Sequence, residues 1–180
     1  MGKVGSTGAR IRLWVVAILS AVLASEAHSG DPMFLWGRAA AGMVVADVRR
    51  AVPQARFSPK PELTSAGWSQ ILYVRVRTGD IDQRVDFQFK DGRLVGVATS
   101  TGALLGLAPL SAEQAATMRG ELLQRYGKPI RCRNTPDGFK ACFWIRNHKF
   151  VGIFERPMEP RSVLLFVHVE QPGDRDLLAD

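Results

Sequence analysis

The sequence predicts an α+β protein made of two tandem repeats, each a helix followed by an antiparallel β-meander, in the order αβββ-αββββ. The first observation is a self-match, in which residues 85–97 align with residues 141–153. The second is that both segments alternate apolar and polar residues around a two-residue turn, which is the pattern of a β-hairpin. The third is a helical pattern upstream of each hairpin. Together these observations indicate a duplicated supersecondary unit.

The N-terminal segment, residues 1–27, has the organisation of a Sec-type signal peptide. Three basic residues precede an apolar run over residues 13–24, and Ser25-Glu26-Ala27 forms a small-x-small cleavage site. The run is shorter than the ~20 residues that a membrane-spanning helix requires. We therefore expect cleavage, no transmembrane helix in the mature chain, and a periplasmic or secreted protein. An uncleaved membrane anchor is the alternative.

The chain is basic, with 24 Lys and Arg against 17 Asp and Glu and a formal net charge of +7. Residues 1–27 hold three of the basic residues and one of the acidic ones, which leaves 21 against 16, a net charge of +5. Such a charge favours an acidic partner, for example an anionic envelope polymer, although scattered positive charge also serves solubility alone. Because there is no lysine-rich run and no interleaved aromatic platform, nucleic acid is not predicted as a partner.

The first repeat is predicted over residues 28–100 and begins with a short helix over residues 42–53. Proline cannot continue a helix, so Pro53 ends it. Residues 57–70 then read as a loop longer than usual that carries an apolar Trp68, and such loops are often functional. The inward-facing positions of the helix are expected to be Val44, Val48, Ala51 and Val52.

The strands of the first repeat follow this loop. Residues 71–78 alternate as a strand, and a four-residue loop from Gly79 to Asp82 would place Arg75 opposite Asp86 as a cross-strand ion pair. The next two strands form the first hairpin around Asp91-Gly92, a dipeptide typical of a type I′ turn.

The second repeat begins with the longest predicted helix of the mature chain, Ser111 to Tyr126. Ser111 and Gln114 have the spacing of a capping box, and Gly127 suits the helix end. The apolar stripe of this helix is Ala115, Met118, Leu122 and Leu123. A final strand over residues 162–170 is expected to pair back onto the second hairpin. The remaining predicted boundaries are an apolar linker over 101–110, the second repeat over 111–170 and a flexible tail over 171–180.

The second hairpin turns at Asn147-His148. Counting outward from the two turns places Phe87 opposite Gly96 in the first hairpin and Phe143 opposite Gly152 in the second. A phenyl ring can lie over a bare glycine and stabilise the strand there, so we expect these pairs to serve core packing.

Both cysteines of the chain lie close together, at Cys132 and Cys142. A three-residue hairpin loop over Pro136-Asp137-Gly138 places them directly opposite each other at a non-hydrogen-bonded position, which suits a disulfide. Two cysteines are too few for a structural zinc site. A disulfide agrees with an oxidising compartment. A reduced, buried pair is the alternative.

This register has a consequence for two arginines. It leaves Arg131 and Arg133 on the same side as the apolar Phe143 and Ile145. Either the strand is an edge that runs beyond helix cover, so that the arginines reach water, or the loop length is one residue out.

The order of elements resembles a known fold. Gly42-Met43 opens the first helix with Val48 five residues on, an antiparallel sheet follows, and the whole is duplicated. This arrangement resembles the BamE-like and β-lactamase-inhibitor-protein-like fold over most of residues 40–170. The resemblance implies a binding or scaffolding role. Members of this group include a lipoprotein, which carries a lipidated cysteine at its cleavage site. This chain departs from that pattern because no cysteine lies near its predicted cleavage site.

Candidate site residues are few, and no catalytic motif is present. His168 and Glu170 lie two residues apart on the predicted final strand, as a ligand pair or an acid–base pair would, or as a surface pair without function. The candidate binding residues are Trp68 of the long loop and the arginines of two strands, Arg75, Arg77, Arg131 and Arg133.

These observations predict an exported, non-catalytic binding or scaffolding protein of the bacterial cell envelope, whose partner is a protein or an anionic envelope polymer. No cofactor or metal is predicted. The alternative is a small periplasmic hydrolase or metal-dependent enzyme centred on His168 and Glu170.

Overall fold

The computed structural model describes the chain from Pro32 onward with short gaps. The described residues are 32–64, 66–102, 106–157, 160–175 and 178. The predicted signal peptide, part of the predicted linker and part of the predicted tail lie outside them. Residues Pro32–Asp180 form one compact unit.

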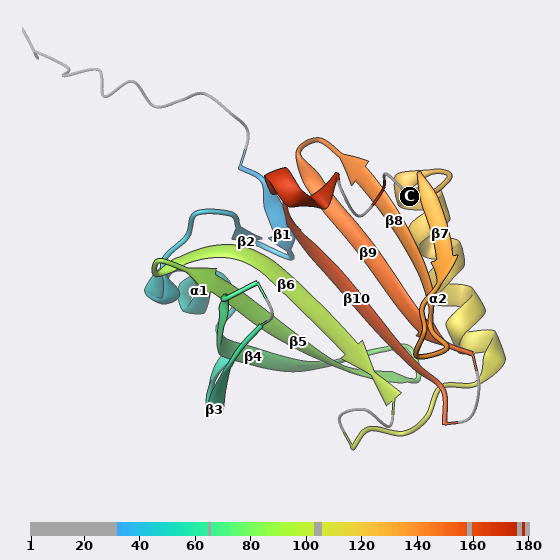
Figure 1. Cartoon of the computed structure of the whole chain (residues 1–180). Helices are drawn as coiled ribbons and strands as arrows, with labels where there is room; N and C mark the ends of the chain where they lie inside the picture. Colours follow the sequence, from blue (N-terminus) through green and yellow to red (C-terminus); the bar gives the residue numbers. More distant parts are fainter. Residues whose placement is uncertain (1–31, 65, 103–105, 158–159, 176–177, 179–180) are drawn as a thin grey trace, which may run out of the picture. The chain divides into compact units, whose positions relative to one another are not determined.

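One antiparallel sheet of eight strands dominates this unit, in the order β3-β4-β5-β6-β10-β9-β8-β7. Its strands are β3 (Arg56–Leu63), β4 (Ser69–Thr78), β5 (Ile81–Lys90), β6 (Arg93–Thr101), β7 (Arg131–Asn134), β8 (Lys140–Arg146), β9 (Lys149–Arg156) and β10 (Ser162–Val169). Figure 1 shows the red-orange β10 between β6 and β9, and it pairs with both. The last strand therefore joins the two predicted halves into a continuous sheet.

Helix α1 (Val45–Ala51) precedes β3, and helix α2 (Ala112–Tyr126) lies between β6 and β7 in the chain. A two-stranded sheet of β1 (Phe34–Trp36) and β2 (Ala39–Ala40) precedes α1, and a 3₁₀ helix, η2 (Pro172–Asp174), follows β10. The α+β class is thus observed. Four strands, not three, follow the first helix.

The additional strand is β3, which covers half of the segment that the sequence predicts to be a loop. Pro59 and Pro61 lie within it, and proline lacks the N–H that a sheet ladder needs. These prolines are tolerated because β3 is an edge strand whose pairing with β4 is interrupted between Phe57 and Glu62. A proline-rich edge strand has the composition of a loop, which explains the wrong prediction.

Helix α2 begins and ends as predicted. The Ser111 hydroxyl accepts the N–H of Gln114 at 3.1 Å, and the Gln114 side chain accepts the N–H of Ser111 at 2.8 Å. Gly127 follows the last turn with φ of 75°. Of the predicted stripe, Ala115, Met118 and Leu122 are buried, whereas Leu123 is 44 % exposed because it lies at the margin of the contact with the sheet.

Both helices pack on the same face of the sheet, because their buried residues belong to one apolar cluster with the sheet. That cluster contains Val48 of α1 and Met118 of α2. The strands contribute every second residue, as the two-residue period of a strand requires. Among them are Leu72, Val85, Phe87, Val97, Trp144, Val151 and Val167.

The other face carries a second apolar cluster, and neither α1 nor α2 covers it. Ala141, Phe143 and Phe150 are its buried members, and Ile145, Phe154, Phe166 and Leu178 pack against them. Strand β10 shows the division clearly, since Val163 and Val167 belong to the helix-side cluster and Phe166 to this one.

The second hairpin has the predicted register, with Phe143 opposite Gly152. The first does not, because Gln88 pairs with Gly96 but Phe89 pairs with Leu94. The extra residue, Val95, is a β-bulge that shifts all later pairing by one.

This shift turns the two predicted repeats toward different faces. Phe87 now lies opposite Val97 in the helix-side cluster, whereas its aligned counterpart Phe143 lies on the other face. The predicted Phe87–Gly96 pair is therefore wrong. The sequence match does not extend to equivalent packing.

The turn between β4 and β5 is also shorter than predicted. Thr78 pairs with Ile81, so the turn contains only Gly79 and Asp80. Arg75 consequently lies opposite Arg84 and not opposite Asp86.

The predicted disulfide joins Cys132 and Cys142, which are direct partners in the β7–β8 ladder with 4.1 Å between their Cα atoms. The three-residue loop is confirmed by the bond from the Thr135 N–H to the Phe139 carbonyl, at 2.7 Å. Arg131 and Arg133 lie on the apolar side because β7 is an edge strand, the last in the sheet. This is the first of the two explanations given for them above. A disulfide is compatible with an exported protein.

Within the part of the chain that the structure describes, neither helix has the length and apolar character needed to cross a membrane.

Candidate binding cavity

A cavity of about 660 Å³ lies on the face of the sheet opposite α1 and α2. Its floor comes from β5, β6, β10 and β9, and its rim from the segment between β3 and β4 and from η2. We call this the sheet cavity.

The hollow exists because β6 presents small residues to this face. Gly96, Ala98 and Ser100 alternate along β6, so all three lie on one side of the strand. The neighbouring strands carry larger side chains at the paired positions. These are Gln88, Asp86 and Arg84 on β5, and His168, Phe166 and Leu164 on β10. A strand of small side chains between two strands of large ones forms a trough.

Gly96 has a particular role in the floor. A Cβ at this position would lie 2.8 Å from the Cβ of His168 and 3.0 Å from Oε1 of Gln88. Glycine therefore allows these two polar side chains to approach each other across β6.

Aromatic rings form one wall of the sheet cavity. The Phe150 and Phe166 rings are nearly parallel to the His168 imidazole, with centroids 5.1 Å and 5.7 Å from it. The Trp68 ring lies edge-on to the His168 imidazole, with 5.0 Å between the ring centroids and 71° between the ring planes. The indole is only 7 % exposed, so the segment before β4 folds over the trough.

Two buried carboxylates line the sheet cavity. Asp86 accepts bonds of 2.9 Å and 2.7 Å from Nε and Nη2 of Arg84, and burial raises the pKa of Asp86 although Arg84 opposes the rise. Asp174 accepts the N–H of Gln171, and its Oδ2 lies 3.6 Å from Nδ1 of His168. Burial likewise raises the pKa of Asp174 against these two partners.

Two polar groups on the cavity floor lack a partner. Nδ1 of His168 lies 2.9 Å from the Val169 carbonyl, which can only accept, so Nδ1 carries a proton, and in the neutral imidazole Nε2 is then an acceptor. Neither Nε2 nor the side-chain amide of Gln88 has a hydrogen bond to any described residue, although the two residues as a whole are only 6 % and 7 % exposed. Both residues line the cavity, so these groups are open to a ligand or a water molecule there, which can supply the missing hydrogen bonds.

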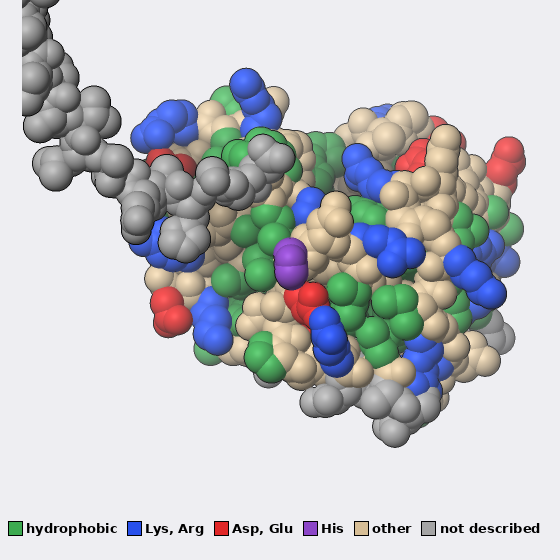
Figure 2. Space-filling view, turned by 90° about the horizontal axis from the view of Figure 1, so that it is seen from above, with side chains coloured by type: hydrophobic (Ala, Val, Ile, Leu, Met, Phe, Trp, Pro, Cys, Tyr) green, Lys and Arg blue, Asp and Glu red, His purple; other side chains and the backbone are tan. Residues whose placement is uncertain are grey.

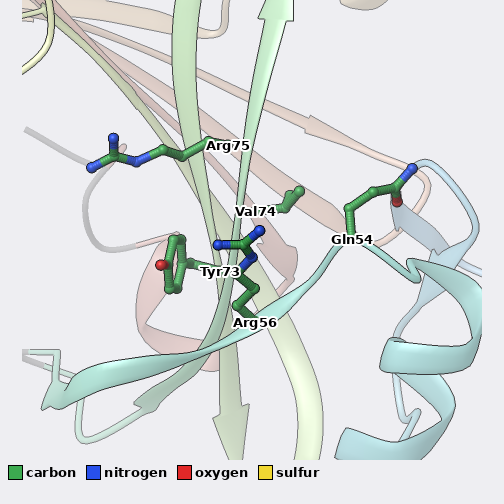
Figure 3. A pocket seen from close by; sticks show the side chains of 5 residues that line it. All are labelled: Gln54, Arg56, Tyr73, Val74 and Arg75. Carbon is green, nitrogen blue, oxygen red and sulfur yellow. The ribbon is translucent and has the colours of Figure 1, made fainter.

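The predicted binding residues do not gather at one place. Trp68 lines the sheet cavity. Arg75 lines a separate hollow of about 330 Å³ where β3 begins beside β4, together with Arg56 and Gln54. Figure 3 shows the side chains of Tyr73 and Arg75 extending to one side of β4 and that of Val74 to the other.

The remaining predicted arginines lie elsewhere. Arg77 is exposed and 3.9 Å from Asp82. On the far edge of the sheet, Arg131 donates to the Leu178 carbonyl at 3.1 Å, and the Arg133 guanidinium lies 5.7 Å from the centre of the Phe143 ring. Strands β5, β6, β10, β9 and β8 separate β4 from β7. On the face seen in Figure 2, Lys and Arg side chains are likewise spread among apolar ones.

His168 and Glu170 do not form the predicted pair. Glu170 follows the end of β10, its carboxylate accepts a 2.8 Å bond from Arg175, and it does not line the sheet cavity. The carboxylate beside His168 is that of Asp174. The described residues contain no group of three or more His, Cys, Asp and Glu side chains placed to hold a metal ion.

Sequence reasoning missed most of the cavity. Asp174 lies in the segment that the sequence predicts to be a flexible tail, and Gln88 carries no motif. One signal was available, since small residues at 96, 98 and 100 of a strand mark a face without bulk.

No family model, no curated protein and no solved structure matches this chain.

Proposed function

We propose that this protein is an exported, non-catalytic binding protein of the bacterial cell envelope, and that its ligand occupies the sheet cavity. The observation that carries the proposal is the trough along β6, which ends at two polar side chains, Gln88 and His168, that face the cavity with hydrogen-bonding atoms unpaired among the described residues. Ligand sites in proteins are commonly concave and largely apolar, with a few convergent polar groups, and have volumes of roughly 300–1,000 Å³. The sheet cavity has each of these properties. The disulfide and the signal-like N-terminus support the exported location.

The surroundings of His168 favour binding over catalysis. A histidine that activates a nucleophile needs a hydroxyl or thiol within hydrogen-bond reach. In the described part of the chain, the only hydrogen bond of the His168 side chain is to the Val169 carbonyl. Asp86, the other buried acid, is bound to Arg84. Two hydroxyls line the described part of the cavity, those of Thr64 and Ser100, and neither is hydrogen-bonded to His168.

The cavity also narrows the choice between the two predicted partners. An anionic polymer requires basic groups at its site, and no Lys or Arg is among the described residues that line the cavity. Arg75 and Arg133 lie near opposite edges of the sheet. The cavity thus supports a small molecule or a side chain of a partner protein as the ligand.

A screen of small aromatic fragments by protein NMR tests this proposal. We expect binders to shift the indole N–H of Trp68 and the ring signals of His168. Ser100→Phe fills the trough and should abolish these shifts. Gln124→Phe adds the same side chain at an exposed position of α2 and should leave them unchanged.

Two outcomes would contradict the proposal. One is a screen in which no fragment perturbs Trp68 or His168. The other is chemical turnover of a bound molecule that His168→Ala abolishes, which would make the site catalytic.

A further inference from the structure

We infer that the sheet cavity binds an organic ammonium ion, a protonated amine attached to an aromatic or other apolar body. The inference rests on the proposed function, because it names the class of ligand for the same site. It follows from the charge, the hydrogen-bonding groups and the rings that the cavity presents.

The charge of the cavity is opposite to that of the chain. Three carboxylates line it, those of Glu62, Asp86 and Asp174, and none of its described lining residues is Lys or Arg. The whole chain has 24 Lys and Arg against 17 Asp and Glu, so a lining drawn from its average surface would be basic. Arg84 offsets the charge of Asp86 from outside the lining, which leaves Glu62 and Asp174 to attract a cation.

The unpartnered groups on the floor are suited to an N–H donor. In the neutral imidazole, with Nδ1–H donated to the Val169 carbonyl, Nε2 of His168 is an acceptor. Oε1 of Gln88 is a second acceptor, and both lie beside Gly96 on the same row of the sheet. An ammonium group has several N–H donors on one nitrogen and can satisfy two such acceptors at once. A neutral alkyl group satisfies neither.

The aromatic wall complements the same ligand. Aromatic faces attract cations and also pack against apolar rings. Phe150, Phe166 and Trp68 border the acceptor pair, because all three rings lie against His168. An ammonium ion at the acceptors would therefore have its apolar body among these rings.

Three phenols of similar size test the inference against the unmodified protein at pH 7. They are tyramine, which is a cation, 4-propylphenol, in which a methyl group replaces the ammonium, and 4-hydroxyphenylacetate, which is an anion. Titration followed by the Trp68 indole signal gives the three dissociation constants. We expect tyramine to bind at least about tenfold more tightly than 4-propylphenol, and the anion to bind more weakly than either.

The result separates the two proposals. If 4-propylphenol binds as tightly as tyramine, or the anion binds most tightly, the cavity is a ligand site but the inference about ammonium ions is wrong. If none of the three shifts the Trp68 signal at millimolar concentration, and the fragment screen is also negative, both proposals are wrong.

Charge variants show whether the selectivity arises in the cavity. Glu62→Gln, on an exposed edge strand, and Asp174→Asn should each lower the tyramine preference by about threefold or more. Glu121→Gln removes one charge from the exposed surface of α2, away from the cavity, and should leave the preference unchanged. An equal loss in Glu121→Gln would overturn the inference, because overall charge alone would then explain the preference.

Gln88→Met tests the acceptor pair and keeps the size of the side chain. This substitution should weaken the binding of tyramine and leave the binding of 4-propylphenol unchanged. Equal weakening of both phenols would contradict the role of Gln88 as an acceptor.

Discussion

The ring of Phe166 lies directly over Gly152 of the adjacent strand. A Cβ at position 152 would be 2.1 Å from Cζ of Phe166, a distance that non-bonded carbon atoms do not reach. The sequence pattern placed the Phe143 ring over this glycine, and Phe143 is indeed its cross-strand partner on β8. The ring that covers Gly152 comes instead from β10, on the other side of β9.

Gly152→Ala is expected to destabilise the protein, because Phe166 must move out of the aromatic cluster to make room. Overpacking of this kind costs about 1–3 kcal/mol in the free energy of unfolding. Urea unfolding followed by circular dichroism measures the change.

Gly120→Ala is the matched control. Gly120 lies within α2, is exposed, and has open space where a Cβ would lie. Alanine favours a helix interior over glycine by about 0.5–1 kcal/mol, so this variant should be more stable than the unmodified protein. A stabilised Gly152→Ala would contradict the packing of Phe166.

Removing the disulfide should lower stability. The bond joins two cysteines that are 10 residues apart in the sequence. For a loop of this size the chain-entropy model gives a contribution of roughly 2–3 kcal/mol to the free energy of unfolding. The double variant Cys132→Ala, Cys142→Ala should lose about this amount in urea unfolding. The unmodified protein under reducing conditions should behave like the double variant. Two alkylatable thiols in the non-reduced protein would show that the bond is absent.

Asp86 should make stability depend on pH in a specific direction. Burial raises its pKa above the ordinary value of 3.8, so between 3.8 and the raised pKa the folded state binds more protons than the unfolded state. Across that window the Asp86 contribution to the free energy of unfolding falls as the pH rises. Asp86→Asn should remove this slope, which urea unfolding at a series of pH values above 3.8 would show. If the free energy of unfolding fell more steeply with pH in Asp86→Asn than in the unmodified protein, the prediction would be wrong.

Trp68 and the arginines of β4 should differ in their effect on ligand binding. Trp68→Ala removes an aromatic wall of the cavity and should raise the dissociation constant for tyramine by roughly three- to thirtyfold. The double variant Arg75→Glu, Arg77→Glu changes two side chains that do not line the cavity and should not weaken it. Near-ultraviolet circular dichroism checks that both variants keep their fold. Loss of binding only in the arginine variant would place the ligand at β4.

Local sequence signals determined a substantial part of this protein. The Ser111 capping box, the Asn147-His148 turn and the pairing of Cys132 with Cys142 were predicted correctly. Each depends on residues that are near neighbours in the sequence, so the covalent chain itself sets the geometry. The positive φ of 59° at His148 shows that turn geometry was recognised even with an unfavourable residue.

Only the tertiary structure decided which face of the sheet each residue occupies. The bulge at Val95 shifts the pairing by one residue, and a shift of one residue moves the rest of a strand to the opposite face. No local pattern encodes it, because the shift is stabilised by packing against the helices and against β10.

The sheet cavity is a product of the same non-local effects. Gln88, His168 and Asp174 come from segments far apart in the chain and meet only because β10 pairs with β6. The sequence therefore determined the longer helix, the turns of the two hairpins at Asp91-Gly92 and Asn147-His148, and the disulfide. The pairing of strands from the two halves determined the candidate site, because its free energy arises from contacts that no single segment contains.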